Sequence, residues 1–572
     1  MTEKLDAEPY AHLPEHPEKP FLRIVGVATA RACSPGDACT WGLAFHVIFP
    51  YSPRPRRTVR ARILSRPDRR LAEELPDAIY PEGPCVSHTK LYDSRVLVDR
   101  EFTDVFEVHR LPEGSYTAEA ELVDVDGGVC GRDSLNFDVG PPSRLKHRID
   151  LVFGGWKGPP EKAHFLAGFA MTGDVDGDGD AEYVHVVGSV HMAVYRGNGE
   201  LLWRYDDPEG VMAYSIHGSL WDFNGDGKCE IVCPRGTFGN LKLCMLEGGT
   251  GRVLKEIEYP CINKLEPVPA DAPDLGELLH KTGHAIRVVG GQHMLGGYIR
   301  AANFRGLSSR RDVMLQVGEQ NCVTIVALTD ELEELWQYRC ENGRAGHCAG
   351  FFDADGDGRD EIAVGTCLLD HDGKLLWELP FEAFAAPWED DHVDESNGGD
   401  LSGDGRIKVV YSSRLVVDAM TGERLWIDPT WHGQQAEAVK LRDDIPGLQL
   451  VFADREYRHS RHMMHGEWHD VRDSHGNKLW SRRFMGMQQV QVVDWLGNGL
   501  KQITSPSDLQ RYAPNPSLQI FDGWGTLVDV LPAVAAHYDE YLHGQVPPGE
   551  LVQHPCEPCP HGEIRVFRSG RV

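Results

Sequence analysis

Acidic side chains recur at fixed spacing in short segments of the chain. In the first segment, residues 173–186 (GDVDGDGDAEYVHV), Asp174, Asp176, Asp178 and Glu182 occupy positions 1, 3, 5 and 9, and intervening glycines let the backbone curl so that alternate carboxylates point inward. Oxygen ligands at this spacing suit Ca²⁺. An EF-hand is excluded, because its Glu stands at position 12 between two helices. A solvated acidic loop is the competing interpretation.

The same loop followed by an apolar strand returns in "WDFNGDGKCEIV", "FDADGDGRDEIAV" and "GDLSGDGRIKVV". Weaker copies near residues 302, 439 and 493 keep the turn and strand but lose most ligands. Structural calcium is therefore expected in four loops. The expected ligands are Asp174, Asp176, Asp178, Glu182, Asp222, Asn224, Asp226, Glu230, Asp353, Asp355, Asp357, Glu361, Asp400, Ser402 and Asp404.

A second set of reactive side chains stands shortly before these loops. It comprises His217, Tyr298, His347, His392, His432 and Gln488, with Arg300, Arg305 and Arg344 close by in sequence. If the repeats are arranged radially, these groups form a ring at one mouth of a central channel. A surface or core histidine is the competing interpretation of each one taken singly. The arginines would make the mouth cationic, which suits a carboxylated ligand.

This constellation fits β-elimination on a uronic acid. The reaction needs the carboxylate neutralised, a base to remove the adjacent proton, and an acid to protonate the departing glycosidic oxygen. His and Tyr are natural proton-transfer groups, and Arg or a cation is a natural neutraliser. Hydrolysis by paired carboxylates has weaker support, since the closely spaced acidic residues are assigned to the calcium loops.

The elements that position these groups are repeats with a period of roughly 50 residues, which is typical of a β-propeller. Each loop-and-strand copy is followed by another strand and a turn, which in five copies lead into Leu-Trp, as in "YRGNGELLWRY" and "LDHDGKLLWEL". Seven copies predict an all-β protein with a seven-bladed propeller. Two stacked sandwiches with coincidental Asp-Gly turns are the alternative.

The domain boundaries follow from these repeats. Residues 1–20 are expected to be an extended arm, and 21–143, with short alternating runs between Pro/Gly turns, an N-terminal fibronectin- or Ig-like β-sandwich. The propeller is predicted over 144–540, with an insertion at about 256–297 that holds a predicted helix at 274–289. Residues 541–572 are predicted to be a tail that packs on or closes the propeller.

The composition of the chain limits the kinds of partner that it can bind. A net charge of -29 argues against nucleic acid and leaves an acidic oligo- or polysaccharide as the expected partner, bound through a locally cationic cleft. No apolar run is long enough to span a membrane, and the opening 20 residues lack the apolar core of a secretory signal. These features predict a cytoplasmic protein, although a secreted form after signal removal would look the same.

The 14 cysteines form no regular framework and are expected to be reduced and buried. In "HPCEPCPHG", the spacing of His554, Cys556, Cys559 and His561 allows a small zinc site, although the Pro-rich setting argues against it.

Three segments, 201–237, 342–366 and 431–456, resemble blade segments of the β-propeller rhamnogalacturonan lyases and of related lyases acting on ulvan-like or rhamnose-glucuronate glycans. The resemblance covers about residues 150–535 and implies Ca²⁺-assisted elimination on a rhamnose- and uronate-containing glycan. It implies catalytic or substrate-contacting roles for His217, His293, Tyr298, Arg300 and His347.

The remaining ring residues complete the predicted site. His392 and His432 join the catalytic candidates, and the expected substrate-binding residues are Arg305, Arg344, Gln434 and Gln488. The chain departs from the family pattern at "HGQQ" (432–435), where those lyases tend to show His-Gly-Asp. The alternative functions are a glycoside hydrolase on the same propeller and a non-catalytic carbohydrate- or protein-binding propeller of the FG-GAP or PQQ type.

Overall fold

The protein is described from a computed structural model. The structure describes residues 21–30, 32, 34–49, 55–83, 89–90, 97–102, 105–152, 168–187, 189, 191–206, 215–236, 241–260, 286–289, 292–317, 323–340, 348–380, 393, 395–428, 433–454, 467–484, 490–506, 517–533, 543–544, 546–553 and 562–572. Within them the fold is all-β, and the single helical element is a short 3-10 turn, η1 (Val108–Arg110).

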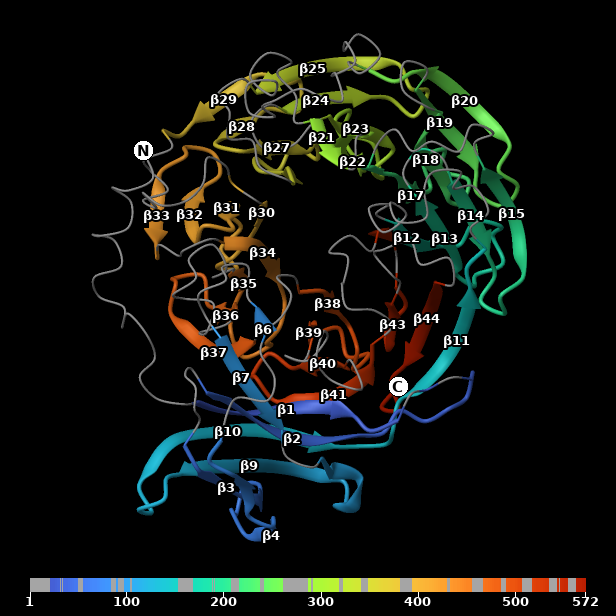
Figure 1. Cartoon of the computed structure of the whole chain (residues 1–572). Helices are drawn as coiled ribbons and strands as arrows, with labels where there is room; N and C mark the ends of the chain where they lie inside the picture. Colours follow the sequence, from blue (N-terminus) through green and yellow to red (C-terminus); the bar gives the residue numbers. More distant parts are fainter. Residues whose placement is uncertain are drawn as a thin grey trace.

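Eight small sheets surround a common centre and form an eight-bladed β-propeller (Figure 1). In seven blades four consecutive strands run from the centre to the rim. These strands are β12 (Gly168–Gly173), β13 (Glu182–Val187), β14 (His191–Tyr195) and β15 (Leu201–Asp206) in blade 1; β17 (Ser219–Trp221), β18 (Glu230–Arg235), β19 (Lys242–Glu247) and β20 (Val253–Glu258) in blade 2; β22 (Gln292–Ala302), β23 (Asp312–Val317), β24 (Val323–Leu328) and β25 (Glu334–Cys340) in blade 3; β26 (Gly350–Phe352), β27 (Glu361–Val364), β28 (Cys367–Leu369) and β29 (Leu375–Glu378) in blade 4; β30 (Ser396–Gly399), β31 (Lys408–Tyr411), β32 (Leu415–Asp418) and β33 (Arg424–Ile427) in blade 5; β34 (Gly433–Val439), β35 (Gln449–Asp454), β36 (Glu467–Arg472) and β37 (Lys478–Phe484) in blade 6; and β38 (Val492–Val493), β39 (Gln502–Pro506), β40 (Ser517–Phe521) and β41 (Leu527–Pro532) in blade 7.

The eighth blade corrects the prediction of seven. It joins β11 (Arg144–Asp150) to β44 (Glu563–Arg568) and β43 (Glu550–Gln553), so segments from the two ends of the propeller region share one sheet. Neither segment carries the Asp-Gly loop or the Leu-Trp motif by which the repeats are counted. The eighth blade closes the ring by packing one face on blade 1 and the other on blade 7.

Short strands extend two blades. β16 (Ser215–His217) and β21 (Ile286–Val289) pair with β22 of blade 3, and β42 (His543–Gly544) pairs with β12 of blade 1. The predicted helix at 274–289 is wrong at its carboxyl end, because residues 286–289 are β21, and its other residues lie outside the described ranges. Nothing in the described part of the chain forms a helix with the length and apolar character of a membrane span.

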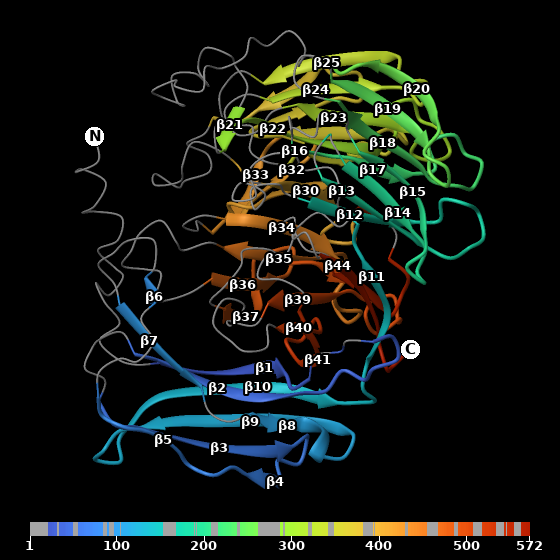
Figure 2. The ribbon, with the colours of Figure 1, turned by 45° about the vertical axis from the view of Figure 1, so that its right-hand side comes forward.

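The N-terminal strands form two sheets beside blade 7 (Figure 2). One sheet holds β1 (Phe21–Ala28), β2 (Trp41–Phe49), β6 (Thr89–Lys90), β7 (Leu97–Phe102) and β8 (Phe106–Glu107), and the other holds β3 (Arg57–Ser65), β4 (Leu71–Glu74), β5 (Ala78–Tyr80), β9 (Gly114–Val123) and β10 (Val129–Val139). Both sheets contribute to one buried cluster, which also includes Leu527 of blade 7. Because β10 pairs with β41, the second sheet is continuous with the propeller, and a separate sandwich over 21–143 stays a prediction.

The Leu-Trp motif joins five of the blades to the blade that follows. Tryptophan side chains on the rim strands donate their indole N–H to a turn carbonyl of the following blade, at 2.7–3.0 Å: Trp203 to Gly248, Trp336 to His371, Trp377 to Ala419, Trp426 to Ser474 and Trp480 to Gly523. Below the ring of Trp336 lies Gly373, where a Cβ atom would come within 2.7 Å of the indole. A glycine is required there because a side chain would displace the ring.

The junction of blades 2 and 3 uses different chemistry. Lys255 stands at the tryptophan position of blade 2, and its ammonium donates to the carbonyl oxygen of Asp330 at 2.7 Å. The residue equivalent to Gly373 is then Leu332, which has a φ of 59°. The two exchanges are coupled, since without an indole above the turn a side chain fits at this position.

We expect Gly373→Ala to destabilise the protein more than Gly127→Ala. Both glycines have positive φ, 80° and 85°, so both substitutions bear the left-handed penalty of about 1–2 kcal/mol. Only at Gly373 does a Cβ meet a neighbour, whereas nothing lies within 4 Å at Gly127. Thermal unfolding of the two variants checks this, and equal melting temperatures would contradict the role given to the Trp336 contact.

Candidate functional site

A tyrosine and an arginine lie two residues apart on β22, the inner strand of blade 3. Tyr298 is 5% exposed, and Arg300 is half-buried with its guanidinium carbon 5.4 Å from the centre of the Tyr298 ring. This is cation–π distance. Opposite Tyr298 on β23 is the fully buried Gln316, whose side-chain oxygen accepts the backbone N–H of Ala349 at 2.9 Å. The pair is therefore held on a strand that is tied to the beginning of blade 4.

A histidine from a different repeat joins this strand. β16 runs parallel to β22, with Ser215, Ile216 and His217 opposite Gly296, Gly297 and Tyr298. Backbones of paired strands lie about 4.8 Å apart. The structure thus brings together His217 and Tyr298, two residues that repeat equivalence predicts at one mouth. Only the backbone of His217 is described.

The other predicted ring residues are only partly placed. His293 lies on β22 opposite Val288, and Gln434 lies on β34; for both, the backbone alone is described. Outside the described residues are His347, His392, His432, Arg344 and Gln488, as are the predicted zinc ligands Cys556 and Cys559. A complete ring therefore stays a prediction.

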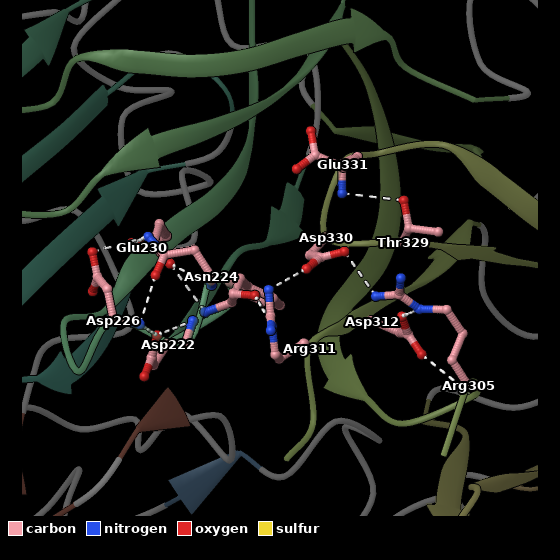
Figure 3. Close-up of polar contacts among 12 residues, drawn as sticks. Asp222, Asn224, Asp226, Glu230, Arg305, Arg311, Asp312, Thr329, Asp330 and Glu331 are labelled. Atoms are coloured by element: carbon pink, nitrogen blue, oxygen red, sulfur yellow. Dashed lines mark hydrogen bonds and ion pairs between the residues drawn. The ribbon is translucent and has the colours of Figure 1, made fainter. Parts of the chain in front are cut away.

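Arg305 does not lie beside Tyr298. It follows the end of β22 and pairs with Asp312 (Nε to Oδ1, 2.6 Å) and Asp330 (2.7 Å), as Figure 3 shows. Because a strand advances about 3.3 Å per residue, the end of β22 is roughly 13 Å from Tyr298. The structure therefore gives Arg305 ion pairs in its own loop, and the expected substrate contact of Arg305 stays a prediction.

Inner strands of blades 5 and 6 carry polar groups that the sequence reasoning missed. The Glu437 carboxylate accepts hydrogen bonds from the side-chain amides of Gln435 (2.9 Å) and Asn397 (3.2 Å). Burial raises the pKa of Glu437 to about 7. Side chains of a strand alternate between its two faces, so "GQQAEAV" puts Gln435 and Glu437 on the same face. This alternation could have identified the pair from the sequence.

Three of the predicted calcium loops share one geometry. The Asp at position 1 accepts two backbone N–H groups of loop glycines, as Asp353 does from Gly356 (2.7 Å) and Gly358 (3.0 Å). The Glu at position 9 is buried and accepts the N–H of the residue at position 2, as Glu361 does from Ala354 (2.6 Å). The equivalent bonds are Gly177 and Gly179 to Asp174, Val175 to Glu182, Gly225 and Gly227 to Asp222, and Phe223 to Glu230.

Two of these three loops bring three carboxylates close enough together to hold a hard divalent cation. Carboxylate oxygens of Asp174, Asp176 and Glu182 lie within 4.8 Å of one another, as do those of Asp353, Asp355 and Asp357. Glu361 is 1% exposed, and its Oε1 has no hydrogen-bond partner among the described residues. Burial, followed by the neighbouring aspartates, raises the pKa of Glu182, Glu230 and Glu361 to about 7, and a bound cation would relieve that cost. In the 222–230 loop the Asn224 amide bonds to Asp226 and Glu230 (Figure 3).

The loop at 400–408 does not fit the same ion. Asp400 still accepts the N–H of Gly405 at 2.9 Å, so the backbone path is kept. Position 9, however, is Lys408, which donates to Asp404 at 3.0 Å. The expected ligand set Asp400, Ser402 and Asp404 therefore lacks its buried carboxylate and already contains a cation.

The class of protein that emerges is an eight-bladed β-propeller with polar and charged side chains on its inner strands and acidic loops at their far ends. No protein-family model matches the chain. It is similar to two curated proteins of Bacillus subtilis (strain 168): rhamnogalacturonan endolyase YesW, at 24% identity over 52% of this chain and 57% of the relative, and rhamnogalacturonan exolyase YesX, at 24% identity over 46% and 48%.

The chain spans about half the length of these curated relatives. Among solved structures, the exotype rhamnogalacturonan lyase YesX is similar with a TM-score of 0.52 and 16% identity, covering 93% of this chain and 88% of that one. The structural likeness supports the propeller fold alone. The sequence similarity to YesW and YesX confirms the resemblance to rhamnogalacturonan lyases.

Proposed function

We propose that the protein is a polysaccharide lyase that cleaves a rhamnose- and uronate-containing glycan, similar to rhamnogalacturonan, by β-elimination. The observation that carries the proposal is the pairing of β16 with β22, which aligns His217 with Tyr298 two residues from Arg300. The two curated relatives are both rhamnogalacturonan lyases, which favours elimination over hydrolysis and over a non-catalytic role.

Arg300 is the group proposed to neutralise the uronate carboxylate. It is half-buried on an inner strand, and its guanidinium can pair with a carboxylate through two parallel hydrogen bonds. Neutralising this charge makes the adjacent C–H more acidic, which lowers the barrier to proton removal. Tyr298 and the histidines at 217 and 347 are proposed to move the protons, one as base and one as the acid that protonates the leaving oxygen.

Calcium is proposed as a structural ion in the loops 174–182, 222–230 and 353–361. When bound, it would supply the positive charge that these crowded carboxylates lack. The loops follow the inner strands at the end away from Tyr298, so the carboxylates serve the fold while Arg300 serves the substrate. Because Arg300 is proposed to pair with a uronate carboxylate, the proposed partner is an acidic glycan.

The proposal is tested by incubating the protein with a panel of uronate-containing oligosaccharides and recording ultraviolet absorbance. A lyase creates a double bond conjugated to the carboxylate, and absorbance rises with cleavage. Cleavage that produces reducing ends without this absorbance would instead identify a hydrolase. No cleavage of any member, by folded and calcium-loaded protein, would favour the binding module.

A further inference from the structure

A loop of similar backbone path follows the inner strand in seven blades, but its charge differs among them. In each loop a side chain near the start of the second strand stands where Glu182, Glu230 and Glu361 accept a backbone N–H of the loop. Asp312, Gln449 and Gln502 keep this bond, to Phe304 (2.8 Å), Leu441 (2.9 Å) and Leu496 (2.9 Å). The loop therefore keeps this hydrogen bond to its backbone even in blades that have lost most of the expected calcium ligands.

In blade 5 a lysine stands at this position. Lys408 is 7% exposed, and its ammonium lies 3.0 Å from both the Asp404 carboxylate and the Arg406 carbonyl oxygen. An ammonium thus contacts one of the carboxylates and a carbonyl that could otherwise face a metal ion.

In blade 6 the cation stands at position 1. Lys440 replaces the aspartate, and its ammonium donates to the carbonyl oxygens of Ile445 (2.5 Å) and Gly447 (2.9 Å) within the same loop. The strand residue Gln449 is neutral, so the second strand of this loop offers no buried carboxylate that could bind a metal ion. The charge is supplied by the chain itself.

In blade 3 the cation stands at position 3. Arg305 pairs with the fully buried Asp312 and with Asp330, which also binds Arg311 at 2.6 Å (Figure 3). Arg311 in turn donates to the carbonyl of Phe223, inside the acidic loop of blade 2. A fixed guanidinium network therefore occupies the loop of blade 3 and borders a loop that keeps its acidic residues.

We infer that Lys408, Lys440 and Arg305 are resident cations that replace a metal ion in blades 5, 6 and 3, so that the protein binds three calcium ions, at 174–182, 222–230 and 353–361. The ion count rests on the calcium proposed above. The exchange is chemically direct: an ammonium or guanidinium supplies positive charge and hydrogen-bond donors to oxygen atoms in or beside the loop, without depending on the free concentration of an ion. Three different loop positions achieve it.

The test is the calcium content of the full chain. Wild type and Lys408→Glu are purified in calcium chloride, dialysed to a low free concentration, and their bound calcium counted by native mass spectrometry. Lys408→Glu restores the acidic position 9 beside Asp400, Ser402 and Asp404. We expect three ions in wild type and four in the variant. Lys408→Met, which removes the charge and adds no ligand, is the control and keeps three.

The outcomes separate this inference from the calcium proposal. Four ions in wild type, or an unchanged count in folded Lys408→Glu, would overturn the resident-cation assignment while leaving calcium elsewhere intact. No ion in wild type but one in Lys408→Glu would uphold the assignment and overturn the three calcium sites. If Lys408→Glu does not fold, its melting temperature in added calcium decides instead, because a new site predicts rescue by calcium and a packing defect does not.

Discussion

Arg300→Gln is expected to reduce turnover of a uronate glycan by about 10²-fold or more, the usual effect of removing one group that stabilises developing charge. Glutamine keeps much of the side-chain length and loses the positive charge. The melting temperature should change little, because Arg300 is half-buried and glutamine can still pack beside the Tyr298 ring and donate to the carbonyl oxygen of Ile299, which Arg300 contacts at 3.4 Å. Initial rates by ultraviolet absorbance measure the effect.

The matched control for this substitution is Arg424→Gln. Arg424 is exposed on β33, a rim strand, and removing it lowers net charge by the same amount without touching an inner strand. Its rate should equal that of wild type. Equal rates for Arg300→Gln and Arg424→Gln would contradict the placement of the site on β22.

Removing calcium is expected to lower thermal stability substantially. An ion that binds only the folded state, present at about 1,000 times its Kd, stabilises by about 4 kcal/mol per site. Without it, each loop holds several carboxylates close together, including a buried Glu whose ionisation burial opposes. Melting curves in calcium and in excess chelator should therefore differ by many degrees.

One pair of variants localises this effect. Asp353→Asn removes a carboxylate from a loop that fits calcium, and should lose one bound ion and part of the calcium-dependent stabilisation. Asp400→Asn alters the equivalent position of the loop that contains Lys408, and should leave the ion count unchanged. If Asp353→Asn and Asp400→Asn bind the same number of calcium ions, position 1 does not distinguish the loops that fit calcium from the loop that contains Lys408.

The propeller follows from the sequence because its repeats carry visible local signals. The repeated loops and turns mark seven blades. In five of them a tryptophan donates the hydrogen bond that connects its blade to the following blade. The eighth blade could not be counted this way. Its strands β11 and β44 are more than 400 residues apart, and their pairing depends on ring closure, which no local pattern reports.

The site was predictable in part. Repeat equivalence identified His217 and Tyr298 as neighbours, although the contact is between strands of separate repeats. Arg305 is close to Tyr298 in sequence but is separated from it by the end of β22, so its expected substrate contact stays a prediction. Glu437 was missed because a single residue several positions before each loop was compared, and Glu437 lies nearer to its loop than His432 does.

The metal ligands show what closer comparison of the repeats would have found. Reading positions 1, 3 and 5 identified four loops, whereas position 9 distinguishes three of them from "DLSGDGRIK", which ends on Lys408. The burial of that lysine and its contact with Asp404 are visible only in the structure. The cytoplasmic location stays a prediction.

Elimination by a site on the inner strands is the central claim, and the fate of water tests it most directly. The protein is incubated with a rhamnogalacturonan-type oligosaccharide in water enriched in heavy oxygen, and the products are weighed by mass spectrometry. The account predicts a product pair whose summed mass equals that of the substrate, with one unsaturated uronate and no heavy oxygen gained on cleavage. Products that together gain one heavy water molecule would show hydrolysis and contradict it.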